Sequence, residues 1–92
     1  MQDTFQGQSY TSFTTTPGAI KNRGGRLVQI VVVSSITGTI TIYDNPSAAS
    51  GTILYTSPTT PTAGQVLPIG MPARSGMWCV PGSAGAFNVV YT

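Results

Sequence analysis

The chain of 92 residues contains no histidine and no glutamate, and its carboxylate side chains are limited to Asp3 and Asp44. Without histidine, the Ser-His-Asp and Cys-His arrangements of nucleophilic enzymes are excluded. Asp3 near the terminus and Asp44 in a turn sequence do not form the carboxylate pair that glycoside hydrolysis uses. Zinc sites need several Cys or His ligands, and Cys79 is the single cysteine. We therefore expect a protein that is not an enzyme, with no catalytic residues, no cofactor and no metal.

Charge is also scarce. Charged residues make up 7% of the chain, compared with about 25% in ordinary soluble domains. Small monomers usually stay soluble through mixed surface charge, so this scarcity suggests a surface that is covered in an assembly. A secreted domain coated with Ser and Thr is the alternative. The net charge of +2 and the small cluster Lys21, Arg23 and Arg26, which has no interleaved aromatic residues, argue against nucleic-acid binding.

Long apolar runs and signal sequences are missing as well. No stretch approaches the roughly 20 apolar residues of a membrane span, and residues 1–16 are polar rather than signal-like. We expect no membrane partner and synthesis in the cytoplasm without export. The lone Cys79 leaves no intrachain disulfide, and its apolar flanks indicate a small buried hydrophobe.

The rest of the sequence consists of short β-rich runs separated by Gly and Pro, with no helical periodicity. The pattern predicts an all-β fold, a small antiparallel β-sandwich (jelly-roll-like or Ig-like) of about seven strands with an extended N-terminal arm. The arm covers residues 1–17 and the sandwich domain covers residues 18–92. The strands are expected near 19–22, 26–34, 38–44, 51–57, 64–69, 75–80 and 85–91.

The run at 26–34 is apolar on both faces, which is unusual for a chain of this size. Simple alternation places Val28, Ile30 and Val32 on one face and Leu27, Val31 and Val33 on the other. A strand of this kind lies centrally in a sheet, and its second face also needs cover. The N-terminal arm or another subunit is expected to supply that cover.

Three aromatic residues, Phe5, Tyr10 and Phe13, are spaced through the polar arm. We interpret them as contacts to a capsid or a neighbouring subunit, made by an arm that adds a strand to an open sheet edge. A floppy terminus is the alternative.

Two further stretches carry candidate features. "MPARSGMWCVP" brings Arg74 close in sequence to Trp78, and both residue types are frequent interface anchors. A buried Trp78 would instead be part of the core. In "YDNPSAASG", Asp44 is interpreted as a residue that turns the chain after a strand.

Residues 24–92 resemble a kind of small tailed-phage virion protein. The segments that carry the resemblance are "GGRLVQIVVVSS", "GTITIYDN", "GTILYT", "MPARSGMWCVPGSAG" and the final "AFNVVYT". The resemblance implies a capsid decoration (cement) protein on the phage head surface, synthesised in the host cytoplasm. Its implied partners are the major capsid protein and copies of itself as a homo-oligomer, a trimer by analogy.

Two alternatives remain open. One is a tail, adaptor or fibre component of the particle. The other is a carbohydrate-binding β-sandwich module that uses Trp78 with Tyr43 or Tyr55 as stacking platforms.

Overall fold

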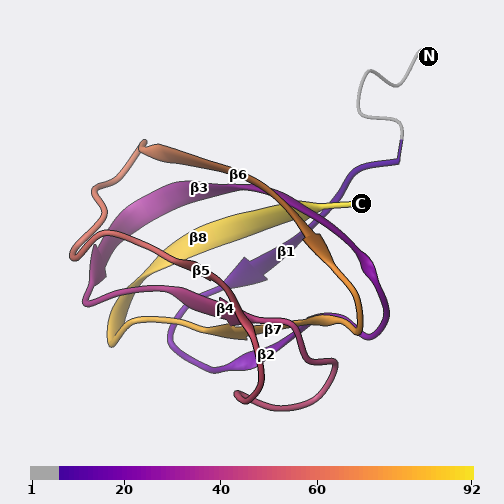
Figure 1. The fold of residues 1–92 in the computed structure, drawn as a ribbon. Coiled ribbons are helices and arrows are strands. Elements are labelled where there is room, and N and C mark those ends of the chain that lie inside the picture. Colours follow the sequence, from indigo (N-terminus) through magenta and orange to yellow (C-terminus); the bar gives the residue numbers. More distant parts are fainter. Residues whose placement is uncertain (1–6) are drawn as a thin grey trace.

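The computed structural model describes residues 7–92, which form two β-sheets packed against each other (Figure 1). Within this part of the chain there are eight strands and no helix. The strands are β1 (Ser9–Phe13), β2 (Gly18–Lys21), β3 (Gly25–Thr37), β4 (Thr41–Tyr43), β5 (Ile53–Thr56), β6 (Val66–Ala73), β7 (Met77–Val80) and β8 (Ala84–Tyr91). The expected small antiparallel β-sandwich is confirmed.

The strand order identifies the kind of sandwich. One sheet has the order β1-β8-β3-β6 and the other has the order β2-β7-β4-β5. The chain is folded back on itself, so that β1 pairs with β8, β2 with β7, β3 with β6 and β4 with β5, all antiparallel. Eight strands wound in this way form a jelly roll, an architecture built from two Greek keys. Of the two expected sandwich types, the jelly roll is therefore the one formed.

The strand β1 lies within the segment that the sequence assigned to the arm. Residues 9–13 pair with β8 along their whole length, with Phe13 opposite Phe87. The two rings stack with centroids 5.6 Å apart, and Phe13 is buried. This corrects the expectation for Phe13, which packs into the core of its own domain instead of contacting a neighbour. Residues 9–13 are thus part of the sandwich, while Phe5 lies outside the described residues.

The core fills the space between the sheets. Leu27, Ile30 and Val32 of β3 all point into it and are almost fully buried. Alternation alone had put Leu27 on the opposite face. The reason is a bulge, because β3 has one extra residue relative to β8 between Leu27 and Gln29. One extra residue reverses the faces on either side of it.

A second irregularity lies on the other side of β3. Between the same two residues of β3, the partner β6 carries an extra residue of its own. Gly70 lies there with a φ of 70°, a conformation that glycine adopts at little cost. The paired irregularities bend β3, whose curvature is visible in Figure 1.

The core also encloses Cys79. Its side chain is fully buried on β7, beside Ile42 of β4 in the sheet register. Burial raises the pKa of this thiol to about 12, so it stays protonated at neutral pH. Cys79 is therefore the small buried hydrophobe that its flanking residues indicated.

Candidate functional site: the two outer faces of the sandwich

Each sheet has an inner face that builds the core and an outer face that does not. On the β1-β8-β3-β6 sheet, two rows of residues cross all four strands on the outside. One row is Tyr10, Val90, Gln29 and Pro68, and the other is Ser12, Asn88, Val31 and Val66. We call these eight residues the β8–β3 face, after its central strands. It contains no ionisable group except the phenol of Tyr10.

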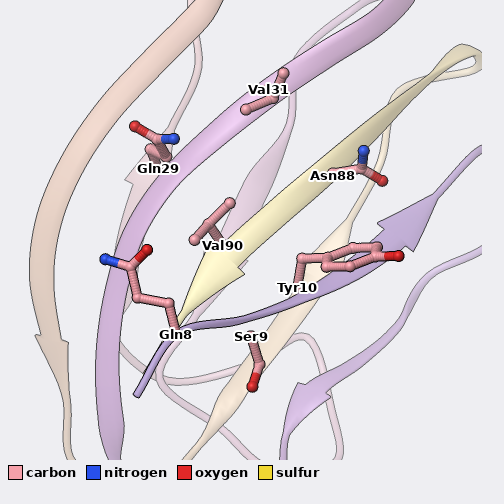
Figure 2. Close-up of a pocket in the computed structure, with 7 residues that line it drawn as sticks. All are labelled: Gln8, Ser9, Tyr10, Gln29, Val31, Asn88 and Val90. Carbon is pink, nitrogen blue, oxygen red and sulfur yellow. The ribbon is translucent and has the colours of Figure 1, made fainter. Parts of the chain in front are cut away.

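The β8–β3 face is hollowed next to its β1 edge, as Figure 2 shows. The hollow has a volume of about 450 Å³ and is lined by Gln8, Ser9 and Tyr10, by Gln29 and Val31 of β3, and by Asn88 and Val90 of β8. Tyr10 is 68% exposed and stands at its side. The surface of the hollow is mainly apolar, Val31 and Val90 are its aliphatic side chains, and the side-chain amides of Gln8, Gln29 and Asn88 are its principal polar groups.

Polar groups on this face are neutral and partly paired with one another. The Ser12 hydroxyl donates a hydrogen bond of 2.5 Å to Oδ1 of Asn88.

The basic residues near this sheet are bound to backbone oxygens. Arg26 lies at the start of β3, and its Nη1 donates to the Gly70 carbonyl at 2.7 Å. Another member of the basic cluster, Lys21, donates from Nζ to the Thr92 carbonyl at 2.8 Å. Two of the three clustered cations thus bind backbone oxygens.

The second sheet has an outer face of a different kind. Met77 and Cys79 of β7 are fully buried, so alternation turns Trp78 and Val80 outward. Ala19, Trp78, Tyr43 and Ile53 form one row across this sheet, and Val80, Thr41 and Thr56 form another. We call these seven residues the β7–β4 face. Trp78 is half-buried and is not part of the core, so it has the exposure that an interface anchor needs.

Trp78 and Tyr43 are register neighbours on this face. Tyr55, the other tyrosine considered as a stacking platform, packs against the core, and burial raises its pKa. An aromatic platform on this sheet would therefore consist of Trp78 and Tyr43.

Arg74 lies in the short connection that leads from β6 in one sheet to β7 in the other. The backbone of this connection is held by the carboxylate of Asp44, which follows β4 directly. The amide groups of Arg74, Ser75 and Gly76 donate to Oδ1 of Asp44 at 3.1, 2.8 and 3.4 Å, and Arg74 also donates to Oδ2 at 3.2 Å. The Arg74 side chain is exposed. The Asp44 carboxylate thus fixes the backbone position from which the Arg74 side chain extends.

The same contacts explain the electrostatics of Asp44. Hydrogen bonds from the amide of Ser75, and then from those of Arg74 and Gly76, lower the pKa of this carboxyl group. The Arg74 charge acts in the same direction, while partial burial opposes it. Asp44 therefore ties two loops together. The local turn is made by Asn45, whose Oδ1 accepts from the amides of Ser47 and Ala48 at 2.9 and 3.0 Å.

The residues expected from the sequence are thus separated in space. Tyr10 lies on the β8–β3 face, Phe13 is in the core, Trp78 is on the β7–β4 face and Arg74 lies in the connection beside Asp44. Sequence reasoning did not assign contact roles to Val66, Val90 and Asn88. Alternation in "AFNVVY" does place Asn88 and Val90 on one face, but only the strand order aligns them with Val31.

Residues 7–92 were also considered for a metal site and for a membrane-spanning helix. In that range no group of His, Cys, Asp or Glu is placed to hold a metal ion. The same range has no helix long and apolar enough to cross a membrane.

No protein-family model, curated protein or solved structure matches this chain.

Proposed function

We propose that this chain is a structural protein of a phage particle, a non-enzymatic capsid decoration protein that binds the outer surface of the head. The observation that carries the proposal is that both outer faces of the sandwich present uncharged, largely apolar rows across whole sheets. A surface of this kind is favourable when it is buried against another protein. The phage setting comes from the resemblance of residues 24–92 to small virion proteins.

The architecture adds support by analogy. Jelly rolls are used by viral capsid domains, although a fold hosts many unrelated functions. A sandwich with two broad outer faces suits a protein whose task is to cover subunit boundaries on a shell.

The contact to the major capsid protein is assigned to the β7–β4 face. Trp78 is its largest side chain, and Trp and Arg dominate the binding energy of many interfaces. Arg74 extends from a connection that Asp44 holds in place, so less freedom is lost when it binds. The β7–β4 face thus offers the Trp78 ring for contact, and the Arg74 guanidinium extends from a fixed backbone position next to the same sheet.

Binding to heads tests this proposal. Purified heads that lack the protein are mixed with the folded chain and sedimented. Wild type is expected to co-sediment saturably, and Trp78→Ala is expected to bind about 30-fold more weakly, the loss of a hot spot worth about 2 kcal/mol. Ser47→Lys, in an exposed loop, is the control and should bind like wild type. A folded wild-type chain that stays in the supernatant at all concentrations contradicts the proposal.

The position on the particle is a separate question. Cryo-electron microscopy of complete particles is expected to show the density of this chain on the head. Density on the tail, at the adaptor or on a fibre would favour the alternative structural roles over decoration.

A carbohydrate-binding role is the second candidate, and the pairing of Trp78 with Tyr43 is the observation that favours it. Adjacent aromatic rings are suited to stacking on sugar rings, and lectin domains are also found among jelly rolls. Retention on a glycan array that is lost in a folded Trp78→Ala variant would support this role. No retention on any glycan, together with binding to heads, would exclude it.

A further inference from the structure

We infer that the β8–β3 face is a two-fold interface at which two copies of this chain pair face to face. The inference concerns the free chain and does not depend on a role in a phage. Three properties of the face point to a second copy as its occupant: its shape, its chemistry and its extent.

The shape provides a projection and a recess side by side. Tyr10 stands 68% exposed at the β1 edge, next to the hollow of about 450 Å³ (Figure 2). A two-fold axis makes each surface patch contact the same patch on its partner. With the axis through the hollow, Tyr10 of each copy lies against Val31 and Val90 of the other. A projection and a recess on one face are what such a contact requires.

The chemistry is compatible with a copy of itself. The central polar groups are the amides of Gln29 and Asn88, and an amide carries both donors and acceptors. Gln29 of one copy can therefore pair with Asn88 of the other. An ionised group on the face would meet its own charge across a two-fold axis, and the face has none. The same neutrality gives a strongly acidic or basic partner nothing to pair with.

The extent of the face fits a weak dimer. The outer side of this sheet, with four strands at a spacing of about 4.8 Å and about five residues on each, covers about 300 Å² in projection. Two copies together would cover about 600 Å² in projection, and the relief of the side chains adds to this area, so the contact belongs to the weak interfaces that bury less than about 1,200 Å². Apolar exposure continues beyond the two rows, because Val33 is 56% exposed on β3.

Pairing through the free edge of β1 is the competing arrangement. Its five residues include no charge and no proline, so the edge is not protected against strand addition. Val31 distinguishes the two arrangements because β3 lies two strands away from that edge. A lysine at position 31 disrupts packing of the faces and leaves the β1 edge unchanged.

Sedimentation velocity of the full chain between 1 and about 200 µM tests the inference. Wild type is expected to shift from 9.5 kDa to twice that mass as the concentration rises. Val31→Lys is expected to raise the dimer Kd about 100-fold or more, because each interface would bury two lysines of like charge. Thr41→Lys, also a β-branched residue on a central strand but on the β7–β4 face, is the matched control and should dimerise like wild type.

Circular dichroism and thermal unfolding establish that each variant is folded. If Val31→Lys does not fold, Tyr10→Ala serves instead, since this exposed side chain lies outside the core, and it is expected to weaken the dimer about tenfold. A wild-type monomer at 200 µM, a trimer, or a dimer that is insensitive to both variants overturns the inference. A dimer that fails to bind heads would refute the capsid role alone, and a monomer that binds heads would refute the dimer alone.

Discussion

The two outer faces of the sandwich differ in the kind of contact that they offer. The β8–β3 face has aliphatic side chains and amides around a hollow, with Tyr10 at its edge. The β7–β4 face has Trp78 beside Tyr43 and lies next to a connection that Asp44 holds. Both belong to one fold of eight strands, so the fold itself does not determine what either face binds. The side chains that alternate outward on each sheet provide the difference.

The largest expected effect is a difference in stability between variants on the inner face of β3 and variants on its outer face. Ile30 is fully buried and its neighbour Val31 faces outward. Ile30→Ala is expected to lower the free energy of unfolding by about 3 kcal/mol through lost burial and a cavity. Val31→Ala is expected to lower it by less than about 1 kcal/mol when measured below the dimer Kd. Urea unfolding of both variants checks this, and equal costs would show that the assignment of the two faces is wrong.

A second pair of variants tests whether β1 belongs to the sandwich. Phe13 stacks on Phe87 inside the core, while Tyr10 on the same strand is exposed. Phe13→Ala is expected to cost about 3 kcal/mol of stability, and Tyr10→Ala about 0.5 kcal/mol or less in the monomer. Thermal unfolding at low concentration measures both. If Phe13→Ala were neutral, the segment would be a detached arm after all.

A smaller effect concerns the connection beside the β7–β4 face. Asp44→Asn is expected to cost about 1 kcal/mol at neutral pH, since an ionised acceptor of amide hydrogen bonds is replaced by a neutral one. The pKa of Asp44 is lowered in the folded state below the ordinary 3.8. Its stabilising contribution is therefore complete above pH 3.8 and is lost as the pH falls through the folded pKa.

Urea unfolding of wild type and Asp44→Asn from pH 7 to pH 2 checks this dependence. The difference between them is expected to stay constant down to about pH 4 and then to shrink. A difference that grows on acidification would mean that folding raises the pKa of this carboxyl group. Asn45→Ala changes the local turn only and is expected to show a difference that does not vary with pH.

Much of the fold follows from the sequence alone. Gly and Pro between β-rich runs indicated the antiparallel sandwich, and each of the seven expected strands overlaps an observed one. Residues 1–17, which include β1, are predicted to form an arm because they are rich in Gln, Ser and Thr, and Phe13 is the single buried apolar residue of β1 in the structure. Whether such a segment docks depends on Phe87, at the other end of the chain. The jelly-roll order could not be predicted either, since strand positions do not specify which strands pair.

The candidate site was less accessible to sequence reasoning for related reasons. The side of Leu27 depends on a bulge that shifts the alternation of β3 by one residue, and the shift is hidden in the sequence because Leu27 and Val28 are both apolar. Trp78 could not be placed from the sequence, because Met77, Trp78, Cys79 and Val80 are all apolar and the alternation does not show which face is buried. The hollow could not be predicted from the sequence either, since Tyr10, Val31 and Val90 come together only when three separate strands align.

Methyl NMR with a soluble paramagnetic probe tests most directly whether a second copy covers the β8–β3 face. The methyl signals of Val31, Val66 and Val90 are expected to be strongly broadened by the probe at low protein concentration and protected at high concentration. The signals of Val80, on the β7–β4 face, should respond equally at both concentrations. Equal broadening of Val31, Val66 and Val90 at all concentrations would contradict the account.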